Sequence, residues 1–261
     1  MFKHAAVTLI AFGSGIGVAA AGPDWTEVGD AGKVNAQIVP FPVQPQFISG
    51  TLGDFPLALL DRGAVGGGND SDGGPDVADV YEIQVEFNDE FIATTYDPSF
   101  TVTLEVEGDE RTGSTNFDTA LWVFRQDRRG LLGNNDISAT NNRSRILPIA
   151  TDGTGSRIAA PGRYLIAVSY GDVAPVSLGG LPLFSFSNNP GSTQVSGPDG
   201  AGGSNGFVAW SPNTLHPIRK YRISIRPTPC PAHCAGDANG DGVVSFLDIT
   251  SVLAAWNSSC R

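Results

Sequence analysis

The residues best suited to chemistry lie near the C-terminus, in the stretch DANGDGVVSFLD at 237–248. Oxygen-bearing side chains recur there at every second position, and a glycine and a final aspartate follow at fixed spacing. Alternating oxygens can surround one side of a Ca²⁺ ion, the glycine permits a sharp turn, and a backbone carbonyl supplies a further oxygen. This spacing predicts a calcium-binding loop whose ligands are Asp237, Asn239, Asp241, the carbonyl of Val243, Ser245 and Asp248.

A short helix with one apolar face is predicted directly behind this loop. Ile249, Val252, Leu253 and Trp256 recur at the spacing that places side chains on one side of a helix. A single loop and helix bury too little apolar surface to be stable alone. We therefore expect this face to pack on a second element, on the preceding domain or on a partner.

Loop and helix together resemble a dockerin repeat. The loop has the order of an EF-hand, with Asp248 in place of the usual final Glu. The flanking cysteines resemble the single-repeat form found at the C-termini of exported planctomycete-type proteins. The resemblance implies calcium-dependent docking onto a protein partner or a cell-envelope component. One repeat is present where an ordinary dockerin has two, and Phe246 and Leu247 occupy the positions where partner-specific residues usually lie.

Three cysteines flank this module, and their positions predict one disulfide. Cys234 precedes the loop and Cys260 follows the helix. A segment returning along a helix of about 9 residues, or about 13 Å, would bring these two sulfurs together. A bridge between Cys230 and Cys260 is the alternative. Zinc binding by CPAHC (230–234) with Cys260 also stays open, although exported chains usually oxidise such cysteines.

Composition indicates an exported, mostly β protein of 261 residues. Its 33 glycines and 18 prolines are typical of a chain with frequent turns. A basic start, an apolar stretch and small residues at 19–21 predict a secretory signal peptide over residues 1–21, and hence a secreted or cell-surface protein. No later segment predicts a membrane span. The formal charge of −11 argues against nucleic acid and anionic membranes as partners.

Alternating apolar and polar residues predict the strands of one large domain over residues 22–226. The pattern fits DVYEIQVEF (79–87), residues 100–106, TALWVF (119–124), GRYLIAVSY (162–170) and YRISI (221–225). TALWVF and GRYLIAVSY are apolar on both faces, which is typical of central strands. A linker rich in proline and cysteine at 227–235 then leads to the calcium module at 236–261.

The middle of the chain is similar to a known family. PDVADVYEIQV, DTALWVFRQDRRGLLGNND, SRILPI and APGRYLIAVSYG follow one another in an order that resembles the bacterial pre-peptidase C-terminal domain. The resemblance covers residues 76–225. It implies a jelly-roll-like β-sandwich that accompanies exported proteins and often binds calcium or polymers.

Two further groups of oxygen-bearing side chains lie in predicted turns of this domain. One group precedes a strand and the other follows a strand: Asp70, Asp72, Asp76 and Asp79; Asn134, Asn135 and Asp136. Hard oxygen ligands on a loop suit Ca²⁺. Asp and Asn are also common in turns that bind nothing. Both interpretations therefore stay open for each group.

Two of the four tryptophans are candidates for a sugar-binding face. Trp122 lies in a core-like strand and Trp256 on the predicted helix, which leaves Trp25 and Trp210.

The chain offers little for histidine-based catalysis. His216 is the only histidine of the predicted domain, and a Ser-His-Asp arrangement needs a histidine within hydrogen-bond reach of its nucleophile. Paired carboxylates stay open, because their separation is invisible in a sequence. We therefore predict a non-catalytic exported binding or structural protein attached through its calcium-dependent C-terminal module. The alternative is a secreted polysaccharide- or peptide-degrading enzyme, or an accessory subunit, that carries the module as a docking tag.

Overall fold

The computed structural model describes residues 24–40, 43–54, 72–96, 117–188, 192–226 and 249–250, and the backbone of strands at 101–106 and 109–114. The chain divides into two units, Ala21–Pro229 and Met1–Ala20 with Cys230–Arg261. In the second unit only residues 249 and 250 are described, and they are helical. The predicted calcium loop, the rest of its helix and the three cysteines lie outside the described residues.

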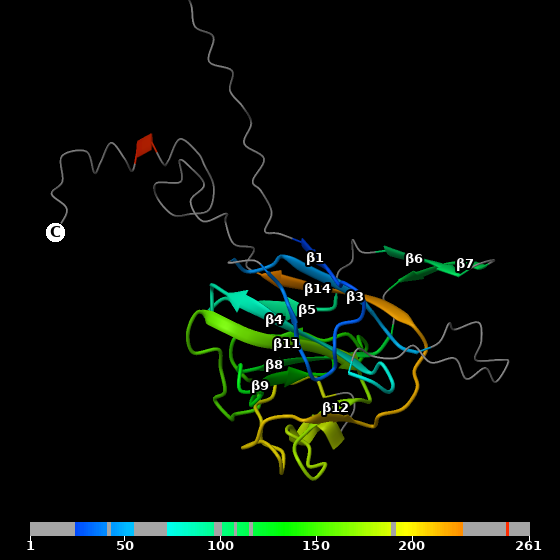
Figure 1. Cartoon of the computed structure of the whole chain (residues 1–261). Coiled ribbons are helices and arrows are strands. Elements are labelled where there is room, and N and C mark those ends of the chain that lie inside the picture. The colour runs from blue at the N-terminus through cyan, green and yellow to red at the C-terminus, as the bar shows by residue number, and fades with distance from the viewer. Residues whose placement is uncertain are drawn as a thin grey trace, which may run out of the picture. The chain divides into compact units, whose positions relative to one another are not determined.

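The unit Ala21–Pro229 is mainly β and is built around two five-stranded sheets (Figure 1). The first sheet contains, in spatial order, β1 (Asp24–Thr26), β3 (Phe47–Leu52), β14 (Arg219–Arg226), β5 (Ile92–Thr94) and β10 (Arg145–Ile146). The second contains β2 (Gln37–Ile38), β4 (Ala78–Val85), β11 (Gly162–Tyr170), β8 (Thr119–Phe124) and β9 (Gly130–Asn134). We call this unit the sandwich domain.

Smaller elements complete the domain. Strand β6 (Thr101–Val106) pairs with β7 (Asp109–Ser114), and β12 (Ala174–Val176) pairs with β13 (Ala209–Ser211). One short 3-10 helix, η2, spans Ser185–Asn188. Both large sheets are mixed, because β1 runs parallel to β3 and β2 runs parallel to β4, while their other pairs are antiparallel.

Strand β4 shows the alternation that the sequence predicts. Tyr81, Ile83 and Val85 are buried, whereas Glu82 between them is only half-buried. This is the pattern of a strand with one face toward a core. Phe87 was expected on the same buried face, and that prediction is wrong: the residue follows the end of β4 and is 40% exposed.

Strand β8 is internal and buried on both faces, as predicted. Trp122 stacks on Phe186 with ring centroids 5.3 Å apart, and Phe124 packs on Phe207 at 4.5 Å. These partners come from the segment after β12, which covers that face of the second sheet. Alternation then places Val123, between the two aromatics, on the opposite face.

Two buried tyrosines connect the large sheets. The hydroxyl of Tyr81 on β4 lies 2.5 Å from that of Tyr221 on β14. Both rings are almost fully buried, so this hydrogen bond joins the second sheet to the first inside the core. Polar atoms buried at this depth need partners, and each hydroxyl supplies one to the other.

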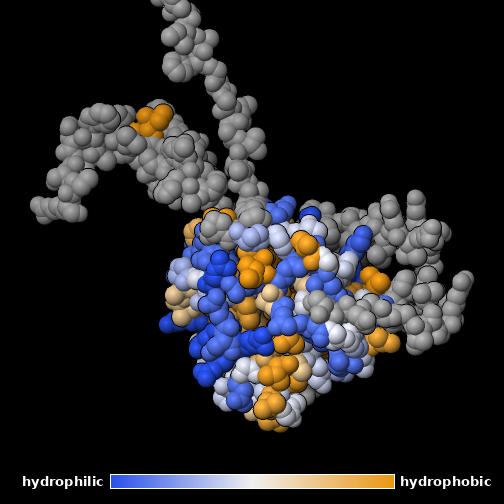
Figure 2. All heavy atoms as spheres, in the orientation of Figure 1, coloured by the Kyte–Doolittle hydropathy of each residue, from blue (hydrophilic) through white to orange (hydrophobic). Residues whose placement is uncertain are grey.

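The surface of the sandwich domain is mostly polar on the face shown in Figure 2, with hydrophobic side chains scattered among hydrophilic ones. Scattered apolar residues of this kind are normal on a folded domain. Within the described segments, no helix has the length and apolar character that crossing a bilayer requires.

Candidate functional site

Three acidic side chains from separate parts of the chain meet in the sandwich domain. Glu27 directly follows β1, Asp30 comes after a turn at Gly29 with a φ of 71°, and Asp79 is the second residue of β4. One carboxylate oxygen of each residue lies within 4.8 Å of the other two. We call these three residues the Glu27 cluster.

Asp79 is the most deeply placed member, with no exposed surface. Its Oδ2 accepts a hydrogen bond of 2.7 Å from the hydroxyl of Tyr221, whereas its Oδ1 has no hydrogen-bond partner among the described residues. Burial, reinforced by the charges of Glu27 and Asp76, raises the pKa of Asp79 well above its usual range. The hydrogen bond from Tyr221 favours the ionised form of Asp79 but does not offset burial and these neighbouring charges.

Glu27 is held in place by backbone amides. Its Oε1 accepts a hydrogen bond of 2.7 Å from Ala31 N–H, and its Oε2 accepts one of 2.8 Å from Thr51 N–H on β3. Burial raises the pKa of Glu27, although these hydrogen bonds oppose the shift. Gly50 makes the approach possible, because a Cβ there would lie 2.6 Å from Oε2 of Glu27 and would also meet the Tyr221 hydroxyl.

The arrangement fits a hard cation. Carboxylate oxygens from three positions lie close to one another, and one of them is a buried oxygen of Asp79 that accepts no hydrogen bond from the described part of the chain. Calcium prefers oxygen ligands of this kind. A cation placed among them would replace repulsion between carboxylates by coordination.

The four aspartates that the sequence groups before β4 do not form one site. Asp70 lies outside the described residues. Asp72 accepts hydrogen bonds from the backbone amides of residues 34–35. Asp76 accepts one from a backbone amide after β3, and only Asp79 joins the Glu27 cluster. Three neighbours in sequence therefore have three different surroundings.

Glu27 and Asp30 were not predicted as site residues from the sequence. These two residues lie about 50 positions before Asp79, and nothing in their own neighbourhood has metal-ligand spacing. The only local signal is a pair of acidic residues on either side of a glycine turn. The parallel pairing of β1 with β3 brings this turn to the cluster.

The group after β9 is also divided by the structure. The Asn134 side chain donates hydrogen bonds of 3.0 Å to the carbonyls of Asp136 and Gln194 and accepts one of 2.7 Å from Arg145 N–H. Asn134 therefore holds the loop together. Asp136 differs, since its Oδ1 is buried and has no hydrogen-bond partner among the described residues.

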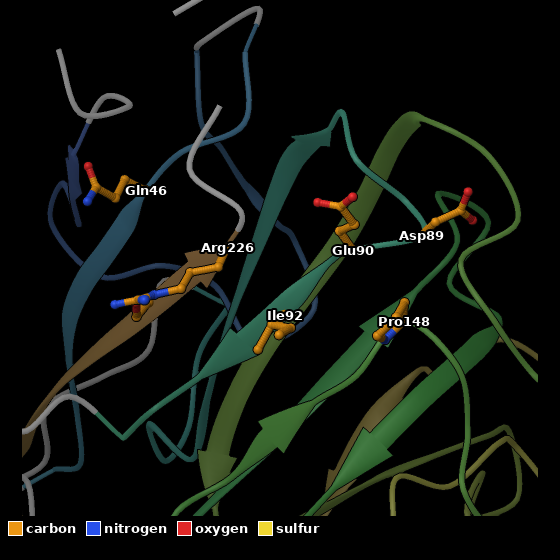
Figure 3. Close-up of a pocket in the computed structure, with 7 residues that line it drawn as sticks. Gln46, Asp89, Glu90, Ile92, Pro148 and Arg226 are labelled. Atoms are coloured by element: carbon orange, nitrogen blue, oxygen red, sulfur yellow. The ribbon is translucent and has the colours of Figure 1, made fainter. Parts of the chain in front are cut away.

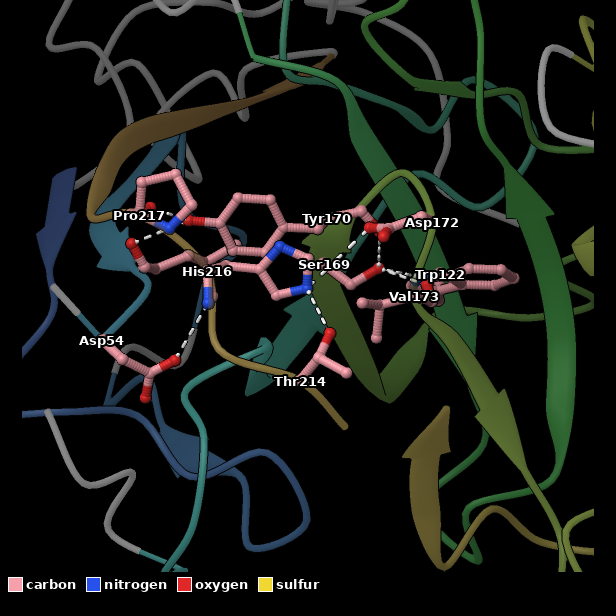
Figure 4. A network of polar contacts seen from close by, with 10 residues as sticks. Asp54, Trp122, Ser169, Tyr170, Asp172, Val173, Thr214, His216 and Pro217 are labelled. Atoms are coloured by element: carbon pink, nitrogen blue, oxygen red, sulfur yellow. Dashed lines mark hydrogen bonds and ion pairs between the residues drawn. The ribbon is translucent and has the colours of Figure 1, made fainter. Parts of the chain in front are cut away.

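His216 is not part of a Ser-His-Asp arrangement in the described part of the chain (Figure 4). Its ring stacks on Tyr170 at 4.1 Å, and its Nε2 lies 3.3 Å from Thr214 Oγ1 and 3.9 Å from Asp172 Oδ1. Ser169, drawn in the same view, is fully buried and donates its hydroxyl to backbone carbonyls. The Ser169 hydroxyl is therefore directed to backbone carbonyls and not to His216.

A pocket lies beside the C-terminal end of β14 in the sandwich domain. This pocket of about 720 Å³ is lined by Gln46, Asp89, Glu90, Ile92, Pro148, Ser224 and Arg226. Its charged side chains point in different directions (Figure 3). They do not converge on one point, so the pocket holds no preformed ion site.

Trp210, one of the two candidates for a sugar-binding face, is buried. Trp210 is 4% exposed and packs edge-on against Trp122 and Phe124. The physical reason is that the segment after β12 folds over β8 and buries its aromatic residues there. Trp25 is half-buried against the core and donates its indole N–H to Gln37 Oε1 at 3.0 Å.

Comparison with known proteins adds no relative from which a role could be carried over. No model of a known protein family matches the chain, and no curated protein matches it.

Proposed function

We propose that the sandwich domain is a non-catalytic binding or structural domain of an exported protein and that it binds Ca²⁺ at the Glu27 cluster. The observation that carries this proposal is the Oδ1 atom of Asp79, which is buried beside two further carboxylates and has no hydrogen-bond partner among the described residues. A buried carboxylate oxygen left in this state costs free energy unless a proton or a cation satisfies it.

Calcium is the cation that the donor set suits best. The three side chains offer only oxygen atoms, and Ca²⁺ takes about six to eight oxygen ligands at about 2.3–2.6 Å. Asp79 would bind through Oδ1, because its Oδ2 already accepts the hydrogen bond from Tyr221. Glu27 and Asp30 would contribute the other carboxylates, and water would complete the shell.

The bound ion would fix the start of the domain to its core. Strand β1 has three residues and pairs with β3 at the edge of the first sheet. Such a short edge strand contributes few backbone hydrogen bonds. Coordination of Glu27 and Asp30 to a cation on Asp79 would tie the segment after β1 to β4, so the role of calcium in this domain is structural.

The remainder of the proposal rests on the sequence. The loop at 237–248 has the spacing of a calcium ligand set, and the order of segments over 76–225 supports a jelly-roll-like sandwich of the pre-peptidase C-terminal type. We infer that the module at 236–261 binds a separate Ca²⁺ ion. Through it a secreted or cell-surface protein would attach to a protein partner or an envelope component, with a carbohydrate polymer as a candidate ligand of the sandwich.

Terbium binding tests the site in the sandwich domain. The full chain would carry Asp237→Ala and Asp241→Ala, so that the C-terminal loop does not contribute. Tb³⁺ replaces Ca²⁺ in oxygen sites, and Tyr221, whose hydroxyl is 2.7 Å from Asp79, is well placed to sensitise its emission. We expect Asp79→Asn to remove one equivalent of calcium-displaceable Tb³⁺ per chain.

The matched control is Asp72→Asn, the same chemical change at a carboxylate that serves backbone amides instead. This control should bind as much Tb³⁺ as its parent. If Asp79→Asn also bound as much as the parent while remaining folded, the calcium site at the Glu27 cluster would be rejected.

A further inference from the structure

One face of the first sheet carries a row of positive charges. Side chains alternate along β14, where Tyr221, Ile223 and Ile225 are buried in the core. We call the opposite side of this sheet, away from the core, the outer face. The residues of β14 that lie on the outer face are Lys220, Arg222, Ser224 and Arg226. Three of these four residues are cations, and neighbours in the row are about 6.6 Å apart along the strand.

A neighbouring strand adds a fourth cation to the outer face. Strand β10 pairs with β5 so that Arg145 lies opposite Thr94, and Thr94 lies opposite Ser224 of β14. Residues directly opposite one another in a sheet share a face, so Arg145 lies on the same side as the row on β14. The five strands of this sheet contain one acidic residue, Asp24. The outer face is therefore positive on balance.

Arg222 is held on the outer face by two residues of β3. Its guanidinium lies 4.7 Å from the centre of the Phe47 ring, and its Nε donates a hydrogen bond of 3.5 Å to Ser49 Oγ. A second contact of the same kind lies just beyond the ends of β5 and β10, where the Arg143 guanidinium is 5.1 Å from the centre of the Tyr96 ring. Cation–π contacts of this kind therefore fix two guanidinium groups in place.

The other three cations of the outer face are exposed: Lys220, Arg226 and Arg145. None of the three forms an ion pair with a carboxylate in the described part of the chain, whereas Arg129 and Arg163 elsewhere in the domain do form such pairs. The chain as a whole has a formal charge of −11. The outer face thus carries a local charge opposite in sign to that of the whole chain.

The pocket of about 720 Å³ beside the C-terminal end of β14 opens on this face, because part of its lining belongs to the outer face: Ser224, Arg226 and Ile92. Its acidic residues are Asp89 and Glu90. Figure 3 shows Arg226 on one side of the pocket and Asp89 on the other. The positive row therefore ends at this pocket.

We propose that the outer face binds an acidic polysaccharide, whose carboxylate or sulfate groups pair with Arg145, Lys220 and Arg226. This inference rests on the proposed function, in which a carbohydrate polymer is the candidate ligand of the sandwich, and it adds the charge of the polymer and the face that binds it. Lys220 and Arg226 are six residues apart on one strand, or about 20 Å, which suits an extended polymer better than a single small anion.

Polar groups between and beside these cations suit the hydroxyl groups of a sugar. Ser224 offers a hydroxyl and Gln46 an amide at the pocket, and both groups can donate and accept hydrogen bonds. The negative charge of the whole chain weakens long-range attraction of any polyanion, so binding depends on the short-range pairs and should weaken as salt is added.

Binding of the full chain to immobilised polymers, measured by biolayer interferometry, tests the outer face. The probes are dextran sulfate and polygalacturonate, with unmodified dextran as the neutral polymer. The buffer contains chelator, because calcium would cross-link polygalacturonate. The face variant combines Arg145→Gln, Lys220→Gln and Arg226→Gln. Each exposed ion pair is worth about twofold to fivefold in affinity, so this variant should bind about ten- to a hundredfold more weakly than the wild type. Unmodified dextran should bind to neither protein.

The matched control removes three exposed cations that lie outside the first sheet. It combines Arg125→Gln, Arg129→Gln and Arg157→Gln, which change the net charge of the chain by the same amount. This control should bind both acidic polymers as tightly as the wild type, because the cations of the outer face are intact.

The outcomes decide the proposal without involving the calcium site. If the face variant, folded by circular dichroism, bound both acidic polymers as tightly as the wild type, or if the control lost as much affinity, the proposal would be rejected. Tighter binding of poly-glutamate or duplex DNA would also overturn it, because the partner would be another class of macromolecule. Binding of only one acidic polymer would support the proposal and identify the acid group. Terbium binding at the Glu27 cluster uses none of the substituted residues and should be the same in the face variant as in the wild type.

Discussion

Calcium should reverse the order of stability of the wild type and the Asp79→Asn variant. Without calcium, the folded state disfavours the ionised form of Asp79, because burial and neighbouring carboxylates raise its pKa. A raised pKa in the folded state gives stability at low pH that is lost as the pH rises through that raised pKa. Asn carries no charge and can still accept the Tyr221 hydroxyl hydrogen bond. In chelator at neutral pH, the variant should therefore be more stable than the wild type.

With calcium the sign changes, because only the wild type keeps the complete Glu27 cluster. A ligand present at a hundred times its Kd adds about 2.7 kcal/mol to the free energy of unfolding. For a domain of this size, 1 kcal/mol corresponds to about 2–4 °C in Tm, so the wild type should gain about 5–11 °C from this site. In the Asp79→Asn variant, calcium should raise Tm only by the amount that the other calcium sites contribute.

Thermal melts followed by near-UV circular dichroism measure both conditions, since Trp122 and Tyr81 report on the core of the domain. Asp72→Asn serves as the control. Hydrogen bonds from Asn35 and Val34 and the charge of Lys33 hold the pKa of Asp72 below its usual value despite its partial burial, so this variant should be less stable than the wild type in both media. The reasoning is refuted if Asp79→Asn differs from the wild type by the same amount with chelator and with calcium.

Three further changes have defined outcomes. Gly133→Ala would place a Cβ 2.8 Å from the Trp122 ring and should lower the free energy of unfolding by about 1–3 kcal/mol in urea titrations; an unchanged midpoint would contradict this packing. Tyr221→Phe removes the hydroxyl that bonds both a buried carboxylate and a buried tyrosine, so urea titration should show a loss of about 1–3 kcal/mol, and a neutral result would speak against the network. Asp237→Ala should increase amide exchange over residues 237–256 in calcium without changing exchange in the sandwich domain, and equal protection in calcium and chelator would count against a calcium-organised loop.

Strand positions could be predicted from the sequence where the burial of a single strand determines its alternation of apolar and polar residues. The predicted segments DVYEIQVEF, TALWVF, GRYLIAVSY and YRISI lie in β4, β8, β11 and β14. Alternating burial is local information, because successive side chains of a strand point to opposite faces. The segment FISGTL of β3 was missed, since Ser49, Gly50 and Thr51 interrupt its apolar pattern.

The order of the strands in each sheet could not be predicted from the sequence in the same way. Strand β14 pairs with β3, which places Ile223 opposite Ile48 from the other end of the domain. Nothing in the residues of either segment specifies the other strand as its partner. The order depends instead on which pairs of sheet faces fill the core best, and this property belongs to the whole chain.

The candidate site was predicted only in part for the same reason. Asp79 was named among four neighbouring aspartates, but its companions in space are Glu27 and Asp30. Metal sites on one loop, such as that expected at 237–248, have their ligands at fixed spacing. A site assembled from the end of β1 and the start of β4 has no such spacing, so the sequence supplies its residues without their grouping.

Burial and hydrogen bonding, taken together, separate aspartates that shape turns from those that offer an oxygen to a cation. Asp152 is of the first kind: its Oδ1 accepts hydrogen bonds from Thr154 and its Oδ2 accepts one from Gly197 N–H. These bonds stabilise the loop and give each carboxylate oxygen of Asp152 a hydrogen-bond donor. Asp79 and Asp136 are of the second kind, since each is buried and keeps an Oδ1 that has no hydrogen-bond partner among the described residues. Turn propensity accounts for the first kind. It does not account for the second, because a turn does not offset the free-energy cost of a buried oxygen without a hydrogen-bond donor, whereas the cation that we propose at Asp79 would.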